Sequence, residues 1–111
     1  MSWVRALATK GLREMLRALE RELDSLYEDL EELSRNRKYN WVEKYAVLTA
    51  YNWINEHAIG LKDVYLNYSD RYPEDLREDL ERVIQKLDEL NLFITASFRD
   101  VFTSDLEPVA D

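Results

Sequence analysis

Apolar residues recur along this chain in alternating steps of four and three positions, and they do so in three successive runs. The first run extends from Leu12 to Leu33, the second from Val47 to Tyr68 and the third from Leu76 to Val101. This spacing places the apolar side chains on one stripe of an α-helix, and such stripes wind helices gently around each other. The pattern therefore predicts an all-α fold built from three long helices with coiled-coil-like heptads.

Polar segments between the runs set the expected helix bounds. We expect helices at about residues 3–34, 41–67 and 73–103, which form one three-helix domain over residues 1–103, with a frayed tail at 104–111. Short connections make consecutive helices antiparallel neighbours. The chain is therefore expected to form an up-down-up antiparallel bundle, in which the first and third helices run parallel.

Individual residues mark several of these bounds. Asn40 and Glu43 have the spacing of a capping box at the start of the second helix, and Ser2 is the expected N-cap of the first. Pro73 suits the first position of the third helix, because a proline there removes no helical hydrogen bond. Gly11 lies where the apolar register of the first helix changes, so we expect a kink or a brief break there.

The composition is typical of a soluble helical protein. Apolar residues make up 46% and charged residues 34% of the 111 residues, and the absence of cysteine excludes disulfides and thiol chemistry. No apolar run approaches the length that spans a bilayer, and the N-terminus lacks the apolar core of a signal peptide. We therefore expect a cytoplasmic protein without a membrane partner. Abundant glutamate and arginine, with a single glutamine, favour a thermophilic source.

The second helix lacks a clear polar face, because a second apolar stripe lies beside the first. In an up-down-up bundle its first half meets the end of the third helix, which also widens in apolar surface, so the excess forms one patch larger than a monomer usually exposes. We expect this patch to join a homo-oligomer, most simply a two-fold dimer within a larger helical bundle. The alternative is that a fourth contact or a splayed bundle buries it within one chain. The interface candidates are Trp41, Tyr45, Leu48, Asn52, Leu92, Phe93 and Phe102.

His57 is the single histidine of the chain, so one chain cannot form a histidine-pair metal site. It follows Glu56, without the Glu-x-x-His spacing of carboxylate-bridged di-iron bundles. A histidine on an apolar helical face is most often a packed residue with one hydrogen-bonded nitrogen, and this is the expectation here. The alternative is a catalytic or pH-sensing histidine.

An acidic cluster at Glu28, Asp29, Glu31 and Glu32 resembles the glutamate-rich magnesium motif of all-helical nucleotide pyrophosphohydrolases. Magnesium needs carboxylates that converge on one point. These residues instead occupy outer positions between the leucines of the first run, and a second Glu-x-x-Asp half is missing. We therefore expect a solvated face rather than a metal site, and we assign no catalytic, metal or cofactor residue.

A basic and aromatic run extends from Arg35 through Arg37 and Lys38 to Tyr39 and Trp41. Basic residues interleaved with aromatics can bind single-stranded nucleic acid. The net charge of −8 weighs against this reading, because neutralising phosphates dominates such binding. The run also lacks the histidine of helical HEPN-type ribonucleases, so nucleic acid is not the expected partner.

The opening Met1-Ser2-Trp3-Val4-Arg5, the leucine-heptad first helix and the Tyr/Trp-rich second helix resemble short all-helical archaeal proteins of unknown function. The resemblance implies no activity and no residue roles. From the residues themselves we expect a non-enzymatic helical scaffold or interaction module that acts as a homo-oligomer, with another protein as a further possible partner. The alternatives are a small helical metal-dependent nucleotide hydrolase or nuclease, and an acidic accessory subunit of a nucleic-acid complex.

Overall fold

The computed structural model describes residues 3–36 and 38–104, and these residues are almost wholly helical. The elements in chain order are α1 (Trp3–Asn36), α2 (Trp41–Tyr68), the short 3-10 helix η1 (Ser69–Arg71), α3 (Glu74–Ser97) and α4 (Arg99–Ser104). The predicted all-α class and its three long helices are confirmed. The N-cap expected at Ser2 and nearly all of the tail expected to fray lie outside the described residues.

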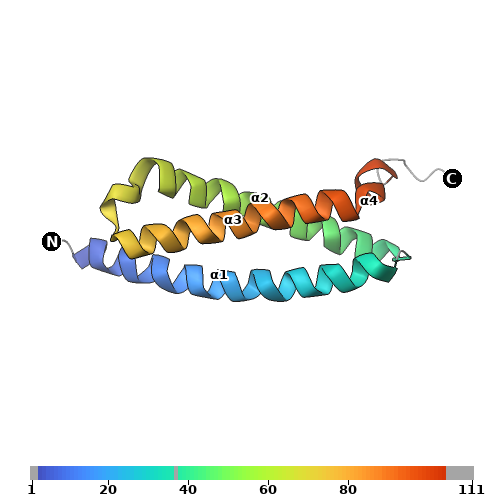
Figure 1. The fold of residues 1–111 in the computed structure, drawn as a ribbon, viewed down its shortest axis with the longest axis horizontal. Helices are drawn as coiled ribbons and strands as arrows, with labels where there is room; N and C mark the ends of the chain where they lie inside the picture. Colours follow the sequence, from blue (N-terminus) through green and yellow to red (C-terminus); the bar gives the residue numbers. More distant parts are fainter. Residues whose placement is uncertain (1–2, 37, 105–111) are drawn as a thin grey trace.

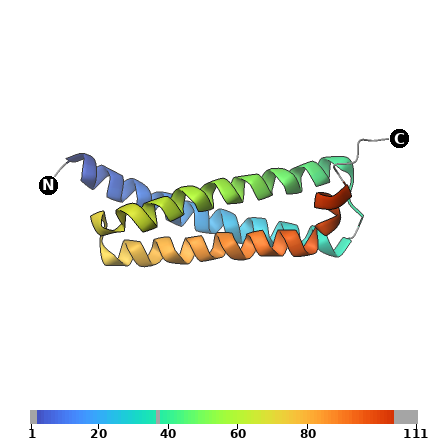
Figure 2. The same ribbon diagram turned by 90° about the horizontal axis from the view of Figure 1, so that it is seen from above.

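The three long helices lie side by side in an elongated molecule of 61 × 25 × 19 Å. Figures 1 and 2 show that α1 and α3 run in the same direction along the molecule. The helix α2, which lies between them in the sequence, runs in the opposite direction. The third helix makes the main contacts with both other long helices. In Figure 1, α2 approaches α1 near their short connection and diverges from it toward the other end. As a result α3 is the most enclosed helix of the three.

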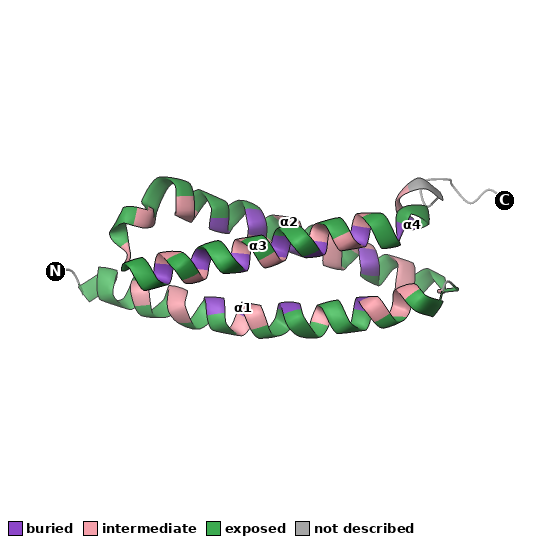
Figure 3. Ribbon diagram, in the orientation of Figure 1, coloured by how far each residue is buried: buried purple, intermediate pink, exposed green. Residues whose placement is uncertain are grey.

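The core follows the three apolar runs (Figure 3). The third helix buries its whole seam, and the two other helices each contribute four buried residues. Among the described residues, every buried side chain is apolar. Burying each valine, leucine, isoleucine or phenylalanine side chain stabilises the fold by roughly 1.5–3 kcal/mol. The buried seam of α3 comprises Leu76, Leu80, Val83, Leu87, Leu90 and Ile94.

The start of α2 has the local structure that its sequence predicts. The Asn40 side chain accepts a hydrogen bond from the backbone N–H of Glu43, and the Glu43 carboxylate accepts one from the backbone N–H of Asn40, both at 2.8 Å. Pro73 lies one position earlier than expected, at the N-cap of α3, and its carbonyl accepts bonds from Leu76 and Arg77. Both helix starts are therefore set by local residues.

The break expected at Gly11 is absent, and α1 runs unbroken from Trp3 to Asn36. A glycine in an exposed helix costs about 1 kcal/mol relative to alanine, which a long helix can absorb. Because the helix continues without a change of register, the apolar side chains before Gly11 do not reach the core. Trp3, Val4 and Leu7 remain exposed instead.

The third helix does not continue to residue 103 as predicted. It ends at Ser97, and Phe98 has non-helical backbone angles (φ −123°, ψ 41°) before α4 begins. A strict heptad would direct the polar Ser97 toward the core. The break instead leaves Ser97 exposed and buries Phe98 completely, with its ring 5.7 Å from that of Tyr39. Burial of a large apolar ring thus outweighs continuation of the helix at this point.

Candidate interaction surface

The clearest candidate site is a second stripe along α2, whose largest apolar side chains are exposed. It keeps the alternating steps of four and three over the length of the helix. We call it the outer stripe; it comprises Trp41, Tyr45, Leu48, Asn52, Asn55, Ile59, Lys62 and Leu66. Trp41, Ile59 and Leu66 are 76%, 71% and 75% exposed. Large apolar side chains exposed in one row mark an interaction surface more often than scattered ones do.

The aromatic end of the outer stripe is ordered by its own contacts. The rings of Trp41 and Tyr45 stack with their centroids 6.1 Å apart and 17° between their planes. Leu48, one turn further on, is half-buried against the core. A stacked Trp–Tyr pair offers a large rigid surface at low entropic cost, and such residues are common hot spots of protein interfaces.

Polar residues occupy the middle of the outer stripe. Asn55 is half-buried, and its side-chain oxygen accepts a 2.6 Å hydrogen bond from the amide nitrogen of Asn91 on α3. Asn52 is exposed and has no side-chain hydrogen bond within the described residues. Toward the end of the helix, Lys62 forms a 3.0 Å ion pair with Asp88. The stripe therefore offers apolar contacts at both ends and amide groups at its centre.

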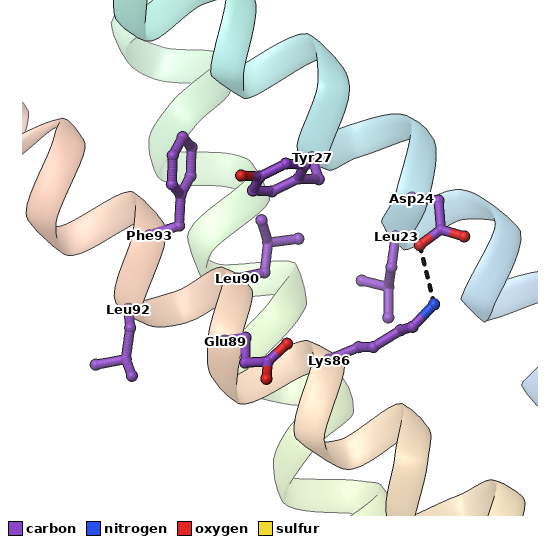
Figure 4. A pocket seen from close by; sticks show the side chains of 8 residues that line it. All are labelled: Leu23, Asp24, Tyr27, Lys86, Glu89, Leu90, Leu92 and Phe93. Carbon is purple, nitrogen blue, oxygen red and sulfur yellow. Dashed lines mark hydrogen bonds and ion pairs between the residues drawn. The ribbon is translucent and has the colours of Figure 1, made fainter.

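The other predicted interface residues do not join this stripe. Phe93 lies against α1, where its ring is 5.0 Å from that of Tyr27, and Phe102 lies 4.9 Å from Tyr51 of α2. Both phenylalanines are thus partly covered within the chain. Leu92 is 66% exposed and lies at the edge of the groove next to Phe93, with its side chain pointing away from α1 (Figure 4). The structure places Trp41, Tyr45, Leu48 and Asn52 on one stripe of α2, whereas Leu92 and Phe93 lie on α3 and Phe102 lies on α4.

The groove between α1 and α3 has a volume of about 560 Å³. Figure 4 shows Tyr27, Leu90 and Phe93 gathered between the two helices, while Leu92 points away from them. An ion pair between Lys86 and Asp24 closes one side. The groove is lined by Leu23, Asp24, Tyr27, Lys86, Glu89, Leu90, Leu92 and Phe93.

Charged side chains cover the rest of the contact between α1 and α3. The pairs Arg13–Asp75, Glu20–Arg82 and Asp24–Lys86 join residues separated by the same 62 positions, as parallel helices require. Hydrogen bonds from Arg82 and then from Lys86 lower the pKa of Glu20 from 4.5 to about 2. This flank is thus a network of ion pairs whose charges are satisfied within the chain.

His57 has the structural arrangement that its sequence context favours. It is half-buried, its Nδ1 lies 2.9 Å from the backbone carbonyl of Trp53, and the two rings are 4.4 Å apart. An Nδ1–H that donates to this carbonyl fixes the tautomer and leaves Nε2 as the second polar atom. No carboxylate contact of His57 is present among the described residues.

The acidic cluster near the end of α1 faces solvent. Glu28, Asp29 and Glu32 are exposed, and Glu31 forms a 3.4 Å ion pair with Arg35. Over residues 3–36 and 38–104, no group of three or more histidine, aspartate and glutamate side chains is arranged to hold a metal ion.

The basic and aromatic run does not form one platform. Tyr39 turns inward, packs on Phe98 and donates a hydrogen bond to Asp100 of α4. Desolvation, followed by the bond to Asp100, raises the pKa of Tyr39 to about 12. Trp41 belongs to the outer stripe instead, and Arg37 lies outside the described residues. The two aromatic members of the run, Tyr39 and Trp41, therefore lie in two different environments.

The sequence pattern did not indicate Phe98 or Asn91, and it grouped Tyr39 with the basic run rather than with the core. A polar residue at a heptad position followed at once by phenylalanine, as at Ser97 and Phe98, is a signal that could have indicated the break. The contact between Asn91 and Asn55 links two helices at a separation of 36 positions, and no local pattern predicts it.

No family model, curated protein or solved structure matches this chain. The resemblance to short archaeal helical proteins stays a prediction. In the described ranges, no helix is both long enough and apolar enough to cross a membrane.

Proposed function

We propose that this chain is a non-enzymatic helical scaffold or interaction module that acts as a homo-oligomer, most simply a dimer. In this proposal the up-down-up helices of each chain join those of a second chain in a larger helical bundle. The observation that carries the proposal is the outer stripe of α2, which repeats the heptad spacing of a buried seam while Trp41, Ile59 and Leu66 stay mostly exposed.

Energetics support a partner of the same kind. Trp41, Ile59 and Leu66 keep most of their surface exposed, and burying each would contribute roughly 1.5–3 kcal/mol. Homodimer interfaces are richer in apolar and aromatic residues than transient ones, and a stripe on one helix can meet its own copy by two-fold symmetry. The outer stripe needs no second type of surface to be covered.

The proposal is tested by measuring the mass in solution by light scattering over a range of micromolar concentrations. We expect twice the chain mass of 13.3 kDa. The double variant Ile59→Glu, Leu66→Glu should give a folded monomer, because both side chains are exposed in the single chain and their loss leaves the core intact. Glu78→Lys, on the exposed polar face of α3, is the matched control and should keep the dimer mass. A folded wild-type monomer at every concentration would overturn the proposal.

A further inference from the structure

We propose that two copies of the chain pair through their outer stripes with the two α2 helices antiparallel, and that the two-fold axis passes between Asn52 and Asn55. This inference rests on the proposed function and adds the orientation and register of the partner. The stripe has eight positions, so an antiparallel copy meets it position by position from the opposite end. The resulting layers place Trp41 against the partner's Leu66, Tyr45 against the partner's Lys62, Leu48 against the partner's Ile59 and Asn52 against the partner's Asn55.

The asparagine layer has donors and acceptors that fit each other. The oxygen of Asn55 already accepts a bond from Asn91, so its own amide nitrogen is left to donate outward. Asn52 is exposed without a side-chain bond in the described part of the chain, and its oxygen can accept that donation from the partner. Two symmetric relays from Asn91 through Asn55 to the partner's Asn52 then satisfy the amides at the centre of the interface.

Charge favours the antiparallel orientation over the parallel one. A parallel pair in register would place Lys62 against the partner's Lys62, which brings two ammonium groups together in the seam. The antiparallel pair places Lys62 against the ring of the partner's Tyr45, where its methylene stem can pack and its charge can lie near the ring face. The ammonium keeps its own counter-ion, since Asp88 lies 3.0 Å away on the same chain.

The same layers fix the register. Sliding one helix by a heptad in one direction sets Tyr45 and Leu48 against asparagines and leaves Leu66 uncovered. Sliding it the other way sets Asn55 against the partner's Ile59 and leaves Trp41 and Tyr45 uncovered. Both alternatives bury an amide opposite an apolar group and lose apolar contacts at an end, each of which is unfavourable. The centred register alone pairs every amide and covers both ends.

Spin labels can measure this geometry directly, because the chain contains no cysteine that would react with them. We would attach spin labels to the single variants Glu56→Cys and Asn67→Cys, both at exposed positions off the stripe. Pulsed electron paramagnetic resonance then measures the distance between the two labels of a dimer. The axis places the two copies of residue 56 about 8 Å apart along the helix and those of residue 67 about 40 Å apart, at 1.5 Å per residue. A parallel dimer would give similar short distances at both sites.

A matched pair of variants tests the Tyr45 layer. Tyr45→Glu would face the partner's Lys62 with an opposite charge, whereas Tyr45→Lys would face it with a like charge. We expect the Kd of the dimer to be at least tenfold higher for Tyr45→Lys than for Tyr45→Glu. In a parallel dimer, residue 45 faces its own copy, so both variants would weaken binding equally. Tyr45 is exposed in the single chain, so circular dichroism should show both variants folded.

The outcomes separate this inference from the proposed function. A dimer with a short distance at residue 56, a long one at residue 67 and the expected order of the two variants supports both. A dimer with equal distances or equal variants overturns the antiparallel pairing and leaves the homo-oligomer standing. A folded monomer without any distance between labels overturns both.

Discussion

The two stripes of α2 have the same spacing and different surroundings. The inner seam packs into the core, and four of its members are buried; it comprises Val47, Tyr51, Ile54, Ala58, Leu61 and Tyr65. The outer stripe lies on the same helix with the same steps of four and three, yet its largest apolar side chains are exposed. Heptad spacing therefore determines that a helix has a seam, whereas the chain's own topology determines whether that seam is covered.

The first helix makes the contrast sharper. Between its buried leucines, α1 carries charged residues at exposed positions, among them Arg17, Arg21, Glu28 and Glu32. A helix with one seam and a charged remainder is complete within a three-helix bundle. The second helix has few charges around the outer stripe, which is typical of a helix that contacts neighbours on two sides.

The largest effect that tests this contrast comes from the same substitution, isoleucine to alanine, made separately at two positions of α2. Ile54→Ala removes a fully buried side chain and should lower the free energy of unfolding by about 2–5 kcal/mol at every protein concentration. Ile59→Ala removes an exposed one and should change the stability of the dilute single chain by no more than about 0.5 kcal/mol. Urea unfolding at submicromolar and at high micromolar concentration measures both.

Concentration provides the control for this pair. The cost of Ile59→Ala should grow as the wild-type protein dimerises, because only then is its side chain buried. Equal costs for the two variants at low concentration would show that the chain covers its outer stripe by itself, and the contrast between the stripes would be lost.

The helices could be predicted because their signals are local. The apolar spacing, the capping box at Asn40 and Glu43, and the turn residues each act within a few positions of the structure that they determine. The helix bounds at the start of α2 and near its end agree with prediction for this reason. The break at Phe98 could not be predicted in this way, since it depends on which of two neighbouring side chains gains more from a core formed by other helices.

A second prediction uses the cap on which both stripes depend. Asn40→Ala removes the 2.8 Å bond that the Asn40 side chain accepts from the backbone N–H of Glu43, keeps the backbone N–H that donates to the Glu43 carboxylate, and should destabilise the protein by about 1 kcal/mol. Because the cap holds the first turn of α2, thermal unfolding should show the loss. Asn40→Asp keeps an acceptor at the N-cap and should recover most of the stability; failure to do so would argue against the cap as the cause.

The interaction surface was only partly predictable from the sequence. Trp41, Tyr45, Leu48 and Asn52 share one stripe by spacing alone, so a single helix suffices to group them. Phe93 and Phe102 could be assigned only with knowledge of the neighbouring helices, because Tyr27 and Tyr51 cover them in part. Patterns within one helix predict a face well, and patterns across helices need the packing itself.

A third prediction concerns the amides that distinguish the outer stripe from the inner seam. Asn52→Leu should weaken the dimer by about 1 kcal/mol or more, because it leaves the side-chain amide nitrogen of the partner's Asn55 buried without an acceptor. It should also loosen the register, so that the distance between labels at residue 67 becomes broadly distributed. Asn67→Leu, exposed and off the stripe, should leave the Kd unchanged. A tighter dimer with a single sharp distance would show that the asparagines do not set the register.

The smallest expected effect is a pH dependence that distinguishes the ion pairs between α1 and α3 from the outer stripe of α2. The pKa of Glu20 falls from 4.5 to about 2 on folding, so its ion pairs with Arg82 and Lys86 stabilise the bundle fully above pH 4.5, and this contribution is lost as the pH falls toward 2. We expect Glu20→Gln to cost about 1 kcal/mol at pH 7, since solvent screens this partly exposed network. Urea unfolding at several pH values should then show the difference between wild type and variant shrinking from pH 4.5 to pH 2. The outer stripe holds no carboxylate at its eight positions, so the Kd of the dimer should be the same for both proteins at each pH. A constant difference across this pH range, or a change in Kd with the variant, would mean that the ion pairs on α1 and the outer stripe on α2 are coupled rather than separate.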